Sequence, residues 1–409
     1  MEVAPILAAL KRSKTGAALV ILQVAFTLAI VSNVSSMIGD RAALVTRPTG
    51  TDEHNLFAIG FRLTGGAQSS AMRAADLANV RAVPGVIDAV ATNTYPLRGS
   101  GWVEGVSQRP GATGIQQQGA QTAVYAMDDH AINTLGLRLT EGRNFTGEEA
   151  IEGNFNTAPL PSVAVVSSSL ERQLFPPGHG LGKLIYLTSD ASKPIAIVGV
   201  VERLQSAAAA GTLDPAKSEN AIILPIHDGG PGGLFIVRVQ PGSLDATMPQ
   251  VQRALINANP NRIFGRLRPF DEIRATAYEK DRSIAIALSV VCLVLILVTA
   301  LGIVGLTSFW VARRKRQIGV RRALGATAAA IVKYFLVENA LLCGLGIVLG
   351  LALAYGLNIW LWGHYGVARL AAGPLLLCAL AVLVLGQGAA LFPALRAARI
   401  APVQALRSV

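Results

Sequence analysis

Long apolar runs alternate with polar stretches along the 409-residue chain, and their lengths predict membrane-spanning helices. Residues 17–38 and 283–311 hold 22 and 29 residues without a charge, and residues 334–362 and 374–395 are similarly apolar. The run of 29 residues would form a helix of about 44 Å, whereas the hydrocarbon core of a bilayer is roughly 30 Å thick. The pattern therefore predicts four transmembrane helices, one near the amino end and three near the carboxyl end.

The segment before the first apolar run is basic and amphipathic. Three apolar and three basic side chains of residues 1–16 fall on neighbouring helical positions: Ile6, Leu7, Leu10, Lys11, Arg12 and Lys14. A short cytoplasmic helix on the membrane surface and a frayed basic end fit this pattern equally well. A cleavable signal peptide also fits residues 17–38, with a weak cleavage site at residues 34–36. Because the apolar run is longer than a usual signal core, we expect a retained helix.

Residues 39–282 have the composition of a globular domain, with a weak internal repeat near its two ends. Strand, helix and strand patterns occur over about 55–95 and recur in the same order over about 233–270. The stretch between them, about 102–231, is mostly β in character. The predicted fold is thus a four-helix membrane protein with a large α+β domain of two subdomains between its first and second helices.

The charge distribution predicts how these helices are oriented. The formal net charge is +11, yet residues 39–282 carry 22 Lys and Arg against 23 Asp and Glu. Segments 1–16, 312–333 and 396–409 together hold 13 basic residues, against one in the short loop 363–373. This positive-inside pattern places both termini in the cytoplasm of a bacterium and residues 39–282 in the periplasm, across the inner membrane. Basic residues confined to membrane flanks indicate contact with lipid and argue against nucleic-acid binding.

Composition and motifs exclude several other classes of protein. With 52% hydrophobic residues and a mean hydropathy of +0.46, the chain is too apolar for an ordinary soluble protein. Residues 178–184 only approximate a phosphate loop, because the first glycine is one residue too close and Leu184 replaces the Ser or Thr that would reach magnesium. No Gly-x-Ser-x-Gly motif surrounds residues 167–169, so a hydrolase has no support.

Metal and disulfide chemistry also lacks a sequence signal. The five histidines never occur at metal-ligand spacing, and the three cysteines all lie in apolar runs. The densest polar cluster, residues 128–130, is interpreted as a solvated turn. We therefore predict no catalytic residue, no metal site and no bound cofactor, which leaves a membrane-anchored enzyme without support.

The segment between the second and third apolar runs holds the most distinctive motif. Residues 316–326 read Arg-Gln-Ile-Gly-Val-Arg-Arg-Ala-Leu-Gly-Ala, residues 335–338 read Phe-Leu-Val-Glu, and the Pro-Ala-Leu-Arg-Ala-Ala-Arg run begins at residue 393. Together with the single amino-terminal helix, these stretches resemble the FtsX-domain permeases of ABC transporters, the macrolide-exporter (MacB-like) family. The likeness covers the whole chain. One departure is Gln317, which stands where the family usually carries Glu.

The resemblance implies a permease subunit without an ATPase of its own. It would act with a second permease subunit, identical or paralogous, and with a cytoplasmic ABC ATPase dimer that binds ATP and magnesium. Nucleotide-driven motion would enter through a coupling loop, residues 312–333, and pass along the second helix to the periplasmic domain. Efflux of a substrate from the periplasmic side, often with an adaptor and an outer-membrane channel, would follow. An FtsX-like signalling permease that regulates a periplasmic enzyme is the alternative.

The match assigns candidate residues to this coupling role. They are Arg316, Gln317, Ile318, Gly319, Arg321, Arg322, Ala323, Leu324, Gly325 and Glu338. We expect Ile318 and Leu324 to enter an apolar groove on the ATPase. The neighbouring Arg321 and Arg322 would then meet carboxylates at the rim of that groove.

Two features of the third apolar run concern packing inside the membrane. Glu338 is the only acidic residue in 283–409, and burying it unpaired would be costly, although it could instead face the headgroup layer. Its candidate partners are Arg321, Arg322 and Lys333. The small residues Gly346, Gly350 and Ala354 recur every four positions and would let another helix approach closely, or they reflect the frequency of glycine in membrane helices.

Overall fold

The computed structural model describes residues 14–66, 68–112, 119–153, 159–210, 212, 214, 218–228, 232–365 and 369–399. Most of the predicted amphipathic segment 1–16 and of the tail 396–409 lies outside the described residues. The chain forms two compact units. Met1–Ala42 and Arg282–Val409 make up a helical unit, and Ala43–Asp281 make up a globular unit.

Within its described residues, the helical unit contains four helices that are long and apolar enough to cross a membrane. They are α2 (Lys14–Thr46), α9 (Glu279–Arg313), α11 (Ala328–Tyr365) and α12 (Ala372–Ala398). Each is longer than the apolar run that predicted it, because residues that flank each run continue the helix. A fifth, short helix, α10 (Lys315–Ala323), lies between α9 and α11 in the sequence.

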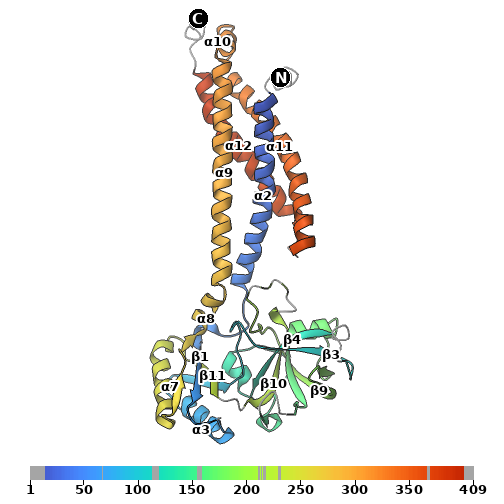
Figure 1. Ribbon diagram of the computed structural model, residues 1–409, viewed down its shortest axis with the longest axis vertical. Coiled ribbons are helices and arrows are strands. Elements are labelled where there is room, and N and C mark those ends of the chain that lie inside the picture. Colours follow the sequence, from blue (N-terminus) through green and yellow to red (C-terminus); the bar gives the residue numbers. More distant parts are fainter. Residues whose placement is uncertain are drawn as a thin grey trace. The chain divides into compact units, whose positions relative to one another are not determined.

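Helix α2 is the most enclosed of the four, with 56% of its most apolar stretch buried inside the protein. Almost completely buried side chains recur every four residues along its inward face, at Val20, Val24 and Leu28. The core around them includes Ile303 of α9 and Leu342 of α11. Figure 1 shows α2 lying alongside the other helices of this unit.

Small residues on α11 set how closely that helix approaches α2. A Cβ atom on Gly346 would lie 2.8 Å from Val24 Cβ, and one on Gly350 would lie 3.0 Å from the Ala25 carbonyl oxygen. One turn further along, Asn33 Nδ2 of α2 donates to the Ala354 carbonyl at 3.1 Å. The structure thus places all three small residues against α2, where larger side chains would force the helices apart.

Polar side chains also link the apolar helices. Thr27 Oγ1 and Thr299 Oγ1 lie 2.6 Å apart between α2 and α9, and Asn339 Nδ2 of α11 donates to the Gly386 carbonyl of α12 at 2.9 Å. Hydrogen bonds between membrane helices contribute about 0.6 kcal/mol each on average. They add directional contacts to the close packing of the helices.

The first subdomain of the globular unit interleaves the two predicted strand–helix–strand repeats. Its elements are β1 (Leu56–Leu63), α3 (Ser70–Arg81), β2 (Val86–Ala91), β11 (Gly232–Val239), α7 (Leu244–Ala258), β12 (Arg262–Phe264) and β13 (Arg268–Pro269). The strand order is β12-β1-β11-β2, with β13 also paired to β1. Strand β11 of the second repeat therefore lies between β1 and β2 of the first, and β1 lies between β12 and β11 of the second. Helices α3 and α7 cover one face of the sheet through a shared apolar cluster. Figure 1 shows this sheet together with α3 and α7.

The second subdomain is an eight-stranded mixed sheet of order β4-β3-β8-β9-β7-β10-β6, with β5 paired to β9 and β4 also paired to β10. Its strands are β3 (Trp102–Ser107), β4 (Ala120–Met127), β5 (Leu139–Gly142), β6 (Ile151–Gly153), β7 (Val163–Ser167), β8 (Leu184–Leu187), β9 (Asp190–Val201) and β10 (Ala221–Asp228). The accompanying helices of the unit are α4 (Ala131–Leu135), α5 (Ser168–Leu174), α8 (Phe270–Ala277) and the 3-10 turns Glu53–Asn55 and Gly147–Glu149. The described residues of the stretch between the two repeats, about 102–231, are thus mostly in β-strands or the turns that join them.

The sequence interpretation of residues 128–130 is wrong for the first of them, Asp128, which follows β4. Asp128 was expected in a solvated turn, but it is buried, and burial raises the pKa of its carboxyl. The Arg81 guanidinium lies 3.8 Å from it, and His130 Nδ1 lies 2.8 Å from Asp88 of β2. The two sheets share one apolar core, so the first subdomain covers a turn that the local sequence alone would leave in water.

Candidate functional site

The candidate coupling segment folds as a short helix between α9 and α11. Helix α10 begins after Arg314 and ends at Ala323, and Gly325 follows with a φ of +94°. The Ala326 amide donates to the Arg321 carbonyl at 3.0 Å, which with the left-handed glycine forms a Schellman stop. Thr327 Oγ1 then accepts the Ala330 amide at 3.2 Å and caps the start of α11.

The inner face of α10 packs within the chain. Ile318 is only 6% exposed and shares a cluster with Ile331 and Phe335 of α11 and with Ala394 of α12. Gly319, next to it, is also buried. Ile318 was expected to enter a groove on a partner, but this side chain is already used inside the permease.

Glu338 lies on α11 opposite the junction of α9 and α10. Its side chain is 2% exposed, and Arg314 Nη1 donates to both carboxylate oxygens at 2.8 and 3.0 Å. The three partners expected from the sequence were therefore wrong, because the basic residue that faces Glu338 is the one between the two helices. The buried pair ties the second apolar helix and α10 to the third.

Two further arginines hold α10 in place. The Arg321 guanidinium lies over the Tyr334 ring, 5.0 Å from its centroid, and Arg322 Nη1 donates to the Ala398 carbonyl near the end of α12 at 2.8 Å. Both had been expected at the rim of a partner's groove. In the structure each has a contact within the chain, so α10 is fastened to α11 and to α12.

The outer face of α10 is open and partly apolar. Leu324 is 83% exposed, and Val320, one turn before it, is 42% exposed. Arg316, Gln317, Ala323 and Gly325 are exposed as well. Sequence reasoning missed Val320, although its four-residue spacing from Leu324 is the signal for a shared helical face.

The surroundings of this face are strongly basic. Lys315 and Arg316 are exposed on the same short helix, and the segment from residue 283 to the carboxyl end has only one acidic residue, the buried Glu338. Two apolar side chains within a basic rim can insert into an apolar groove that carries carboxylates at its edge.

The sequence matches two family models. The MacB-like periplasmic core domain matches residues 15–258, and the FtsX-like permease C-terminal domain matches residues 289–402. The first of these matches covers more than half of the chain.

Two curated relatives illustrate the range of similarity. The uncharacterized ABC transporter permease YknZ of Bacillus subtilis (strain 168) is 24% identical over 341 residues, which cover 78% of this chain and 81% of that protein. The macrolide export ATP-binding/permease protein MacB of Escherichia coli (strain K12) is 29% identical over 286 residues, 67% of this chain and 41% of that protein. The chain thus matches less than half of the length of MacB.

Solved structures match part of the chain at low identity. The periplasmic region of MacB from Actinobacillus actinomycetemcomitans matches with a TM-score of 0.35 and 15% identity over 57% of this chain and 96% of that chain. The extracellular domain of the transporter YknZ matches with a TM-score of 0.32 and 14% identity over 51% of this chain and 100% of that chain. On the two family models, the chain belongs to the ABC transporter permeases that combine a MacB-like periplasmic core domain with an FtsX-like permease domain.

Proposed function

We propose that this permease transmits ATP-driven movement from the cytoplasm to its periplasmic domain and so exports a substrate from the periplasmic side. The open face of α10 supports this proposal most directly. Val320 and Leu324 are exposed on it, while Ile318 packs inside the chain and anchors the helix. A force applied to that face passes to α9, α11 and α12 through Arg314, Arg322 and the buried apolar cluster.

The partner that fits this face is an ABC ATPase dimer, which would bind the ATP and magnesium. Its groove would take the two apolar side chains, and acidic residues at the rim would face Lys315 and Arg316. A second permease subunit completes the assembly, and a periplasmic adaptor with an outer-membrane channel would extend it across the cell envelope. The globular unit, with its two sheets, favours this export role over an FtsX-like signalling role.

The proposal places the permease in the bacterial inner membrane with α10 and both termini in the cytoplasm. Reporter fusions should report the periplasm after Gly111 and the cytoplasm after Ala326 and after the carboxyl terminus. The physical reason is the concentration of basic residues on the segments next to α10. A periplasmic signal after Ala326 would rule out this topology and the role of α10.

The dependence on a separate ATPase can be measured directly. Purified without other proteins, the chain is expected not to release phosphate from ATP, because its sequence holds no complete phosphate-loop motif. Coexpressed with its candidate ABC ATPase from the same genome, the chain should copurify with that subunit. ATP turnover by a preparation shown by mass spectrometry to hold no other protein would contradict the proposal.

A further inference from the structure

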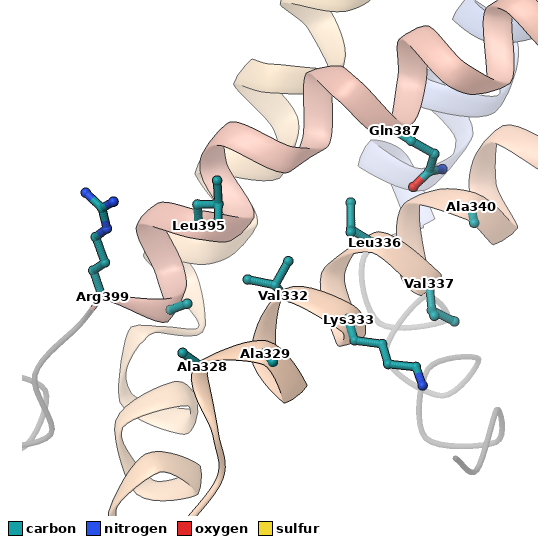
Figure 2. Close-up of a pocket in the computed structure, with 11 residues that line it drawn as sticks. Ala328, Ala329, Val332, Lys333, Leu336, Val337, Ala340, Gln387, Leu395 and Arg399 are labelled. Atoms are coloured by element: carbon teal, nitrogen blue, oxygen red, sulfur yellow. The ribbon is translucent and has the colours of Figure 1, made fainter.

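A hollow of about 720 Å³ lies between α11 and α12, and the side chains that line it are mostly apolar. Figure 2 shows Lys333 and Arg399 extending away from it in opposite directions, so these two cations do not converge on one ligand. Charged side chains that do converge lie in the globular unit, where its two subdomains meet.

The first of these contacts is centred on Asp88 in β2. Its side chain is 5% exposed, and Arg81 Nε of α3 lies 3.2 Å from its Oδ1. From the other subdomain, His130 Nδ1 lies 2.8 Å from the same oxygen, and Asn133 Nδ2 of α4 donates to Oδ2 at 2.7 Å. The Asp88 carboxylate therefore joins the first subdomain to the segment that follows β4.

Asp128, at the end of β4, supplies a second buried carboxylate. Its Oδ1 accepts the His130 amide at 3.0 Å. Its Oδ2 lies 3.8 Å from Arg81 Nη2 and 4.0 Å from Nδ1 of His227 in β10. One guanidinium thus faces both carboxylates, and each carboxylate also faces one imidazole. Together these side chains form a cluster of five: Arg81, Asp88, Asp128, His130 and His227.

The charged side chains around this cluster have other contacts. Glu152 of β6 lies next to β10 and forms an ion pair with Arg73 of α3. Arg238 of β11 lies opposite β2 and forms an ion pair with Asp52 at 2.8 Å. The Asp129 carboxylate lies beside the 3-10 turn that follows β5. The two neighbouring ion pairs are neutral by themselves, so the charge balance depends on the five clustered side chains.

The fixed charges of the cluster do not cancel. Asp88 and Asp128 carry two negative charges when ionised, whereas Arg81 supplies one positive charge. An uncompensated buried charge is costly, so the folded cluster gains from binding one proton. That proton can be placed on Asp128 or on the imidazole of His130 or His227, and each position brings the sum to zero.

The titration of Asp128 has the direction that this charge count requires. Burial raises the pKa of the Asp128 carboxyl, and the neighbouring positive charges offset this effect only in part. An acid with a raised pKa holds its proton more tightly in the folded state than in the unfolded chain. The resulting stabilisation is present at low pH and is lost as the pH rises through the raised pKa.

We propose that this cluster is a proton-operated latch between the two subdomains, in which one bound proton holds the segment after β4 against β2 and α3. The apolar core that the two sheets share stays closed in both states, so loss of the proton loosens the contact locally. The inference does not rest on the export role or on the docking of α10, because all of these residues lie in the globular unit.

The test is backbone hydrogen exchange of the full chain in detergent, followed by mass spectrometry between about pH 5 and pH 8. Rates are corrected for intrinsic exchange at each pH. Protection of residues 128–136 should fall as the pH rises, by up to about tenfold per pH unit, since one proton is linked to closure. Residues 163–167 of β7, in the interior of the second sheet, should show no such change.

Two variants test the position of the proton. Asp128→Asn carries no charge at any pH, so protection of residues 128–136 should stay high and change less than about twofold from pH 8 to pH 6. The double variant His130→Gln/His227→Gln leaves the proton fewer positions and should lose protection at a lower pH than the parent. Asp245→Asn, at an exposed position in α7, is the matched control and should behave like the parent.

Three results would overturn the latch. They are protection in the parent that does not fall with rising pH, an unaltered pH response in Asp128→Asn, and an equal change in Asp245→Asn. If Asp128→Asn fails to fold, the histidine double variant decides the question, because a midpoint at the same pH as in the parent contradicts the proposal.

Discussion

Replacing Leu324 by aspartate is expected to lower the affinity of the permease for its ATPase, or the transport-coupled ATP hydrolysis, at least tenfold. Leu324 is 83% exposed, so the change removes nothing from the packing of the permease itself. Burying a leucine at an interface is worth about 1.5–3 kcal/mol, and ~1.4 kcal/mol is one decade in affinity. The aspartate would also have to enter an apolar groove, which adds to the loss.

Several variants separate this effect from general damage. Val320→Asp should act in the same direction, because Val320 shares the open face of α10. Leu184→Asp, an equally drastic change at an exposed leucine of β8, should leave the interaction unchanged. Arg316→Ala should do less than Leu324→Asp, and its effect should shrink with salt, since an exposed ion pair gives roughly 0–1 kcal/mol.

The measurement is pull-down of the ATPase from membranes, combined with ATP hydrolysis by the purified complex. Insertion and dimer assembly of each variant are checked first by gel filtration in detergent. Wild-type binding and stimulation of the ATPase by a correctly inserted Leu324→Asp variant would show that α10 is not the coupling element. Ile318→Asp is unsuitable for this test, because Ile318 is part of the core of the permease.

Replacing Arg314 by methionine is expected to destabilise the helical unit by about 3–5 kcal/mol. The change leaves the Glu338 carboxylate, 2% exposed, without its only described ion-pair partner. Glu338→Met should be milder, because the Arg314 side chain is 17% exposed and its guanidinium can reach the membrane surface. The double variant should recover most of the loss, since two apolar side chains leave no buried charge.

The readout is thermal unfolding in detergent for the two single variants and the double variant. Arg313→Met is the control one residue earlier, where the guanidinium lies 4.7 Å from the centre of the exposed Phe309 ring and has no ion pair with a described residue. It should shift the unfolding temperature much less than Arg314→Met. Equal stability of Arg314→Met and the parent, or additive losses in the double variant, would mean that the buried ion pair does not hold α10 to α11.

The sequence by itself determined the features that depend on local pattern. The 29 uncharged residues of 283–311 predict a long apolar helix, and this prediction needs no information about the segments that pack against it. The strand–helix–strand repeats were equally local, and α3 and α7 form where the helical period was found. The spacing of Gly346 and Gly350 indicated a close helix contact, although not that α2 would be the helix in contact.

Only the tertiary structure decided which side chains of the coupling segment face a partner. Ile318 and Leu324 are both apolar and only six positions apart, yet α11 and α12 bury one and leave the other in the open. Likewise, Arg314 pairs with Glu338 because the junction of α9 and α10 meets α11 there, across 24 residues of sequence. The burial of Asp128 depends on a second sheet that is built partly from distant segments. Burial and ion pairing are properties of pairs of surfaces, so a single stretch of sequence can name the candidates for a site, but only packing selects among them.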